Sequence, residues 1–237
     1  MMNIEIYQID VASDYEGAKF MSLSNLEKLE LEVDPEIYKL KYSGEVDCTS
    51  LEEIFVTFNN GPVDGFTGHS LSVSDVIGVK NGGNTTYYFC DTVGFEEVSF
   101  DATQAIENKI TVVMCEPDKL AYVTQIDNDL DGLQGAVGGL IEGYYPFPEQ
   151  VCIVCNDEGK INGMPLNRSI VREGKVIEIM AGPFFICDCS RPQYRSLTEE
   201  QQKRYLQMFK YPELFFRSGD EIHAVTYNPD RAVERYR

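Results

Sequence analysis

A four-residue segment, Asn81-Gly-Gly-Asn84, separates two runs rich in β-branched and aromatic residues, at 75–80 and 85–91. Asn and Gly tolerate the positive φ angles that a tight hairpin turn requires. The pattern therefore predicts two adjacent antiparallel strands joined by a short turn.

The second half of the chain carries the same kind of signal. A polar turn, Asn156-Asp-Glu-Gly159, predicts another hairpin between strands at 151–155 and 160–161. Because hairpin turns outnumber helical crossovers, we predict an α+β fold with mostly antiparallel sheets and short helices. Further strands are predicted at residues 3–9, 37–46, 94–100, 110–115, 120–126, 176–180 and 184–187.

Short helices are predicted where a capping side chain precedes a periodic segment. Ser24 and Ser50 each stand three residues before a glutamate, which is the pattern of a capping box. Thr198 provides a similar start for a third helix. The predicted helices cover residues 25–31, 51–58, 130–142 and 199–208.

The strand pattern starts afresh near residues 100–110, where the composition also shifts. We therefore predict two small α+β domains, at 1–105 and 106–209, followed by a C-terminal extension at 210–237. The chain lacks an apolar run long enough to cross a membrane, and its first residues do not resemble a signal peptide. The sequence thus predicts a cytoplasmic protein.

Acidic residues are concentrated in the first of these domains. The chain has 39 Asp+Glu against 20 Lys+Arg, a net charge of −19, and residues 1–110 hold 20 against 6, or −14. Such a charge repels phosphate backbones, so we expect no direct binding of nucleic acid. It would attract a protein with a basic surface, although acidity that serves solubility alone remains the alternative. The candidate contact residues are Glu27, Glu30, Glu32, Asp34, Glu36, Glu52 and Glu53.

Two groups of residues resemble metal ligands without completing a site. Cys152-x-x-Cys155 and Cys187-x-Cys189 supply four thiols, but both segments read as buried strands, on which Cys152 and Cys155 would face opposite ways. The run from Asp127 to Gly132 begins like a calcium loop, yet Gly138 stands where the bidentate glutamate belongs. We expect buried thiols and a helix start, with no metal and no cofactor.

Two hypotheses involve a small molecule. Gly138 and Gly139, together with Asn156, Asn167 and Arg168, would form a pocket for a nucleotide-like ligand, or else would serve the fold.

The other hypothesis is an enzyme that uses His69 with Ser70 or Asp75. Proximity in sequence says nothing about the geometry that such catalysis needs. Because no nucleophile elbow, phosphate loop or dinucleotide motif accompanies these residues, we predict no catalytic residue and a protein that is not an enzyme.

Several longer strings support a resemblance to known families. They are Phe20-Met-Ser22, Tyr42-Ser-Gly-Glu45, Phe66-Thr-Gly-His-Ser-Leu-Ser-Val-Ser-Asp-Val76 and Tyr88-Phe-Cys-Asp-Thr-Val-Gly-Phe95 in the first half, and Leu133-Gln-Gly-Ala-Val-Gly-Gly-Leu-Ile-Glu142, Cys155-Asn-Asp-Glu-Gly159, Pro165-Leu-Asn-Arg168 and Ala181-Gly-Pro-Phe-Phe-Ile186 in the second. Residues 3–100 closely resemble the YodL-like domain. Residues 110–209 resemble a domain family of unknown function that is common in phages and conjugative elements.

This resemblance implies an accessory protein of a mobile genetic element. Neither family has an established reaction, so it implies no catalytic residue. Together with the acidic first domain, it leads to the hypothesis of a non-enzymatic protein that binds and inhibits a basic host protein. A nucleic-acid-binding defence complex is such a partner, and the acidic surface would then mimic nucleic acid. Sequestration of a small ligand by the second domain is the alternative.

Overall fold

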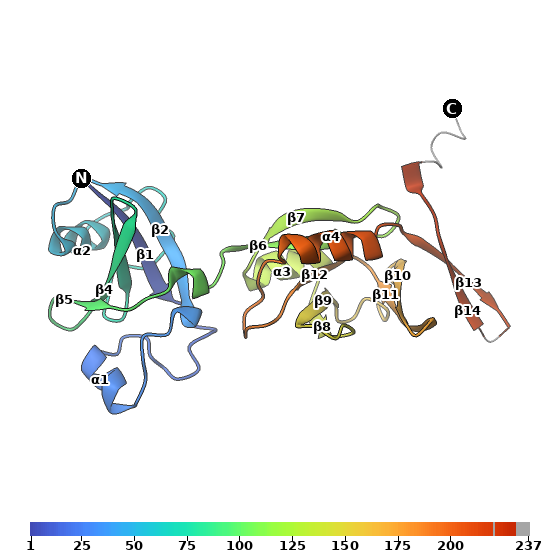
Figure 1. Ribbon diagram of the computed structural model, residues 1–237, viewed down its shortest axis with the longest axis horizontal. Coiled ribbons are helices and arrows are strands. Elements are labelled where there is room, and N and C mark those ends of the chain that lie inside the picture. Colours follow the sequence, from blue (N-terminus) through green and yellow to red (C-terminus); the bar gives the residue numbers. More distant parts are fainter. Residues whose placement is uncertain (220, 231–237) are drawn as a thin grey trace. The chain divides into compact units, whose positions relative to one another are not determined.

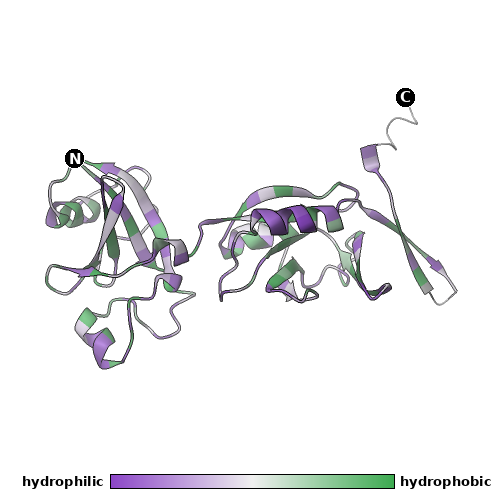
Figure 2. Cartoon of the chain, viewed as in Figure 1, coloured by the Kyte–Doolittle hydropathy of each residue, from purple (hydrophilic) through white to green (hydrophobic). Residues whose placement is uncertain are grey.

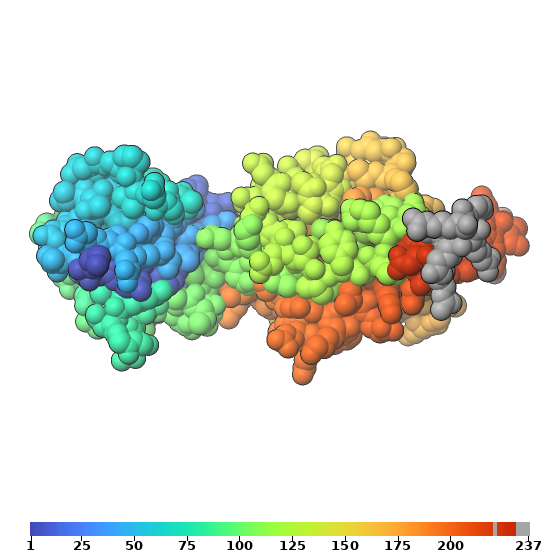
Figure 3. Space-filling view, turned by 90° about the horizontal axis from the view of Figure 1, so that it is seen from above, coloured from blue at the N-terminus to red at the C-terminus, as the bar shows by residue number. Residues whose placement is uncertain are grey.

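The computed structural model describes residues 1–219 and 221–230. The chain divides into two compact units, unit 1 (Met1–Glu107) and unit 2 (Asn108 onward), which Figure 1 and Figure 3 show from two sides. In Figure 3 the surface of unit 1 runs from blue to green, and helix α4 of unit 2 (Glu199–Met208) is orange. No helix in the described part of the chain is long and apolar enough to cross a membrane.

Unit 1 is built on a five-stranded sheet in the order β2-β1-β3-β4-β5. Every pairing in this sheet is antiparallel, and the predicted hairpin at 81–84 is confirmed as the β3–β4 turn. Gly82 and Gly83 adopt φ angles of 56° and 100° there, as the turn requires. The strands are β1 (Met2–Ile9), β2 (Tyr38–Val46), β3 (Val76–Asn81), β4 (Asn84–Cys90) and β5 (Phe95–Val98).

A hydrophobic cluster lies on each face of this sheet. Side chains of β1 alternate between the two faces, so this strand contributes to both clusters. Ile4 and Ile6 pack with Ile54 and Phe58 of α2 (Leu51–Asn59) on one face. On the other face, Tyr7 and Ile9 pack in a cluster that also contains Leu26 of α1 (Leu23–Lys28).

The N-cap residues of the two α-helices in unit 1 show whether the predicted capping boxes form. Ser50 caps α2 and accepts a hydrogen bond from the Glu53 N–H, as predicted. The prediction of Ser24 as the cap of α1 is wrong, because Ser22 accepts the Asn25 N–H and the helix starts at Leu23. The helix also ends earlier than expected, at Lys28.

Unit 2 contains a second five-stranded antiparallel sheet, in the order β7-β6-β12-β9-β8. Val137 of α3 (Leu130–Val137) packs on one face of this sheet, and Tyr205 of α4 packs on the other. Most residues of helix α4 are hydrophilic (Figure 2), and the helix begins with the predicted Thr198 cap. The strands are β6 (Lys109–Cys115), β7 (Tyr122–Asp127), β8 (Ile141–Tyr144), β9 (Val151–Asn156) and β12 (Phe184–Asp188).

Two further strand pairs complete unit 2. One pair is β10 (Leu166–Arg172) with β11 (Lys175–Ala181). The other is β13 (Glu213–Ser218) with β14 (Glu221–Thr226), in the segment predicted only as an extension.

Two predictions for unit 2 are wrong. Strand β9 pairs with β8 and β12, and residues 160–161 lie in a turn, so no hairpin forms around 156–159. The helix predicted for 130–142 stops at Val137, because Gly138 adopts a left-handed conformation (φ 75°) that ends it. The predicted α+β fold with mostly antiparallel sheets is confirmed by both units.

Candidate functional site: an acidic groove in unit 1

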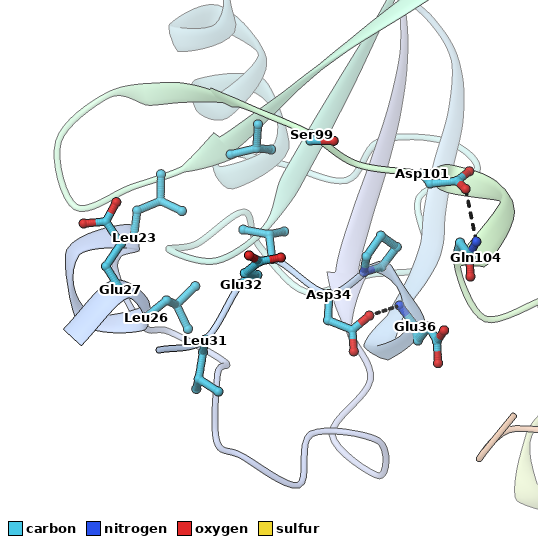
Figure 4. A pocket seen from close by; sticks show the side chains of 13 residues that line it. Leu23, Leu26, Glu27, Leu31, Glu32, Asp34, Glu36, Ser99, Asp101 and Gln104 are labelled. Atoms are coloured by element: carbon cyan, nitrogen blue, oxygen red, sulfur yellow. Dashed lines mark hydrogen bonds between the residues drawn. The ribbon is translucent and has the colours of Figure 1, made fainter. Parts of the chain in front are cut away.

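A groove of about 670 Å³ lies on unit 1 (Figure 4). Its walls come from three segments that the fold brings together: helix α1, residues 31–36, and residues 98–104. The third segment is more than sixty positions away in sequence from the second and begins at Val98, the last residue of β5.

The floor of the groove is apolar. Leu26 is buried and belongs to the core cluster on the α1 side of the sheet. The partly buried Leu23, Leu31, Val33 and Val98 pack against this cluster. The groove is thus an opening onto the hydrophobic core, and a ligand that fills it would shield apolar surface from water.

Carboxylates surround this floor. The acidic residues that line the groove are Glu27, Glu32, Asp34, Glu36 and Asp101. None of the thirteen lining residues is a Lys or Arg, so the formal charge of the lining is negative. A lining of this charge attracts a cationic ligand.

Two of the acidic side chains are held in place by the local backbone. Asp34 caps the 3₁₀ turn Pro35–Ile37 by accepting the Glu36 N–H at 2.9 Å. Asp101 accepts from the Thr103 hydroxyl at 2.7 Å, from the Thr103 N–H at 3.0 Å and from Gln104 Nε2 at 3.2 Å. The hydrogen bond from the Thr103 side chain is the largest cause of the lowered pKa of Asp101, which favours its charged form.

Four of the seven predicted contact residues line this groove: Glu27, Glu32, Asp34 and Glu36. The other three do not. Glu30 follows the end of α1, and Glu52 and Glu53 lie in the first turn of α2. Glu53 accepts the Thr49 N–H at 2.7 Å, which gives it a local structural role. Sequence reasoning missed Asp101, whose place beside residues 31–36 depends on the sheet.

In the described part of the chain, no described pocket is lined by more than one residue of the small-ligand hypothesis. Arg168 is only 1% exposed and donates to the carbonyls of Glu116 at 2.7 Å, Lys119 at 2.6 Å and Phe209 at 3.3 Å. Asn167 is equally buried and donates to the carbonyls of Cys115 and Gly182. Through these hydrogen bonds, the two side chains join separate segments of unit 2.

The other members of that set also have structural contacts. The Asn156 amide donates to the Gly138 carbonyl at 3.0 Å, and its oxygen accepts the Glu158 N–H at 2.9 Å. Gly138 and Gly139 terminate α3, with both N–H groups bonded to the Gln134 carbonyl. Asn156 borders a cavity of about 290 Å³, but these contacts occupy its amide.

His69 takes part in a hydrogen-bond network with two buried residues. Gln8 Nε2 lies 2.8 Å from Asp75 Oδ2 and 3.2 Å from His69 Nδ1, and Gln8 Oε1 accepts the His69 N–H at 3.0 Å. The imidazole itself is exposed, whereas Asp75 is buried. The network ties the 66–75 loop to β1, and the groove lining does not include His69.

The two metal-like motifs have the geometry predicted from their context. Cys152 and Cys155 enter the cores on opposite faces of β9. Asp129 caps α3 by accepting the Gly132 N–H at 2.8 Å. Within residues 1–219 and 221–230, no three His, Cys, Asp or Glu side chains are grouped so as to hold a metal ion.

Comparison with protein-family models agrees with this division into units. Residues 3–100 match the YodL-like domain, and residues 110–210 match the Domain of unknown function (DUF3846). The chain is a YodL-like domain followed by a DUF3846 domain. The acidic groove therefore belongs to the YodL-like domain, except for Asp101 and Gln104 just after the matched range. No curated protein and no solved structure matches the chain.

Proposed function

We propose that this protein acts by binding, and that the acidic groove of its YodL-like domain holds a cationic, amphipathic segment of a partner protein. The observation that carries the proposal is the composition of the groove: five carboxylate side chains around a floor of leucine and valine, with no Lys or Arg in the lining. Such a lining complements a segment that presents Lys or Arg at its edges and an apolar face between them.

The two kinds of lining residue would act at different distances. Carboxylates attract a basic surface over about 8 Å at physiological salt, which speeds encounter and orients the partner. The apolar floor acts only on contact, when a leucine-sized side chain displaces water. A phosphate chain would gain nothing from that floor, so the groove favours an amphipathic segment of a protein over a nucleic acid.

The proposal includes the biological setting. The protein would be an accessory factor of a phage or conjugative element, and it would inhibit a host defence protein by covering a basic surface. The acidic net charge supports a cationic partner of this kind, including one that normally binds nucleic acid.

The proposal assigns no reaction to the groove. Its lining contains no His, Cys or Lys that could serve as a base or nucleophile. The lowered pKa of Asp101 is the opposite of what a proton donor near neutral pH requires.

A synthetic peptide tests the proposal. The full chain would be titrated into a fluorescent helical peptide with leucines on one face and lysines beside them, and binding followed by anisotropy. We expect binding that weakens steeply with salt, and much weaker binding of peptides in which the lysines become glutamates or the leucines become serines. Equal binding of all three peptides would contradict the proposal.

A further inference from the structure

Three cysteines lie on the α3 side of the central strands of unit 2. Cys152 of β9 stands directly opposite Cys187 of β12, and their sulfur atoms are 3.8 Å apart. Cys189 is two residues beyond Cys187, so it lies on the same side of the strand. Its N–H donates to the Gln150 carbonyl at 3.0 Å, which continues the ladder beyond the end of β12.

The three cysteines differ in their exposure to solvent. Cys152 and Cys187 have no exposed surface, and both belong to the core cluster under α3. Cys189 is partly exposed. Of the three residues, Cys189 is thus the one that solvent contacts.

The pKa values of the three thiols are shifted in different directions. Hydrogen bonds from the Cys187 and Cys189 thiols lower the pKa of Cys152. Burial raises the pKa of Cys187, and it raises the pKa of Cys189 to about 12. By contrast, burial raises the pKa of Cys155, on the other face of β9, to about 11. Of the three, Cys152 is thus the thiol whose pKa the cluster lowers, which favours its thiolate, the form that attacks oxidants.

We propose that Cys152, Cys187 and Cys189 form an oxidisable thiol site, in which a hydroperoxide converts Cys152 into a disulfide with one of its two neighbours. The site would be a place of reversible modification, independent of the groove in unit 1.

The reaction has two steps. The Cys152 thiolate attacks one peroxide oxygen, so that an S–O bond forms, the O–O bond breaks, and the other oxygen leaves with a proton as water or an alcohol. Cys152 is then a sulfenic acid. The sulfur of Cys187 or Cys189 attacks it, the S–S bond forms, and hydroxide leaves with the thiol proton as water.

The full chain would be treated with excess hydrogen peroxide and its disulfides mapped by peptide mass spectrometry. We expect the loss of two hydrogen atoms, five of the seven thiols still open to alkylation after unfolding, and one disulfide that contains Cys152. Cys152→Ser should abolish the disulfide, whereas Cys155→Ser, a change on the same strand and the opposite face, should leave it unchanged.

Circular dichroism of each variant would confirm that its fold is retained. In the double variant Cys187→Ser/Cys189→Ser, Cys152 should stop at the sulfenic acid, which dimedone traps. The proposal is overturned if the treated protein keeps seven free thiols, or if Cys152→Ser still forms a disulfide within the chain.

Discussion

Gln8 Nε2 donates a 2.8 Å hydrogen bond to Asp75 Oδ2, and the two side chains are only 0% and 1% exposed. Ser72 supplies the backbone N–H at 2.9 Å to the same oxygen. Burial is the dominant influence and raises the pKa of Asp75 from 3.8 to about 6, although the hydrogen bonds from Gln8 and Ser72 oppose it. A carboxylate is thus kept in the interior of unit 1 by partners from β1 and from its own loop.

Asp75 should make stability depend on pH in a specific window. The pKa of Asp75 is higher in the folded than in the unfolded protein, so the folded state binds this proton more tightly. The proton therefore stabilises the fold at low pH, and this stabilisation is lost as pH rises from about 4 to about 6. Asp75→Asn should remove this pH-dependent loss of unfolding free energy, which is about 3 kcal/mol at most. Urea unfolding of both proteins at several pH values measures the difference. A wild-type-minus-variant difference that is flat across this window would show that Asp75 is not protonated there.

Arg168 should matter for folding. Arg168→Ala removes the donor of three carbonyls, two in the turn between β6 and β7 and one at the end of α4, and we expect a loss of about 3 kcal/mol or more in the free energy of unfolding. Arg172→Ala is the matched control, because Arg172 is exposed and donates to one carbonyl, that of Pro146. Thermal unfolding should separate the two variants clearly. Similar stabilities would contradict the structural role given to Arg168.

Two glycines near the end of α3 should respond in opposite ways to the same substitution. Gly138 has a φ of 75°, so Gly138→Ala should cost about 1 kcal/mol. Gly135 is exposed inside the helix with open space around it, so Gly135→Ala should gain up to about 1 kcal/mol. Denaturant midpoints test both. A stabilising Gly138→Ala would be inconsistent with the observed helix end.

Local signals were sufficient for some elements of this fold. The Asn81-Gly-Gly-Asn84 turn was predictable because it joins neighbours in the chain. The pairing of β9 was not, because all six of its residues are buried and show no alternation. Its partners are β8, which directly precedes it in the chain, and β12, which follows almost thirty residues later. The turn after β9 therefore looked like a hairpin although its second strand does not exist.

The groove shows the same limit. The acidic run from Glu27 to Glu36 is visible in the sequence, but the groove also needs Val98 and Asp101, which arrive through the order of the sheet. The sequence likewise could not separate Glu27 and Glu32, which line the groove, from Glu52, which does not. The composition predicted an excess of negative charge in unit 1, and the fold determines which acidic residues line the groove.

The most direct test of the central claim compares two charge reversals of equal size. The variant Glu27→Lys/Glu32→Lys changes the groove, and Asp47→Lys/Glu52→Lys changes exposed acids of unit 1 outside its lining. Binding of the leucine–lysine peptide would be measured for both by anisotropy at the same salt concentration. We predict that the groove variant weakens binding about tenfold or more and the control variant by much less. Equal losses in the two variants would show that net charge attracts the peptide and that the groove is not its site.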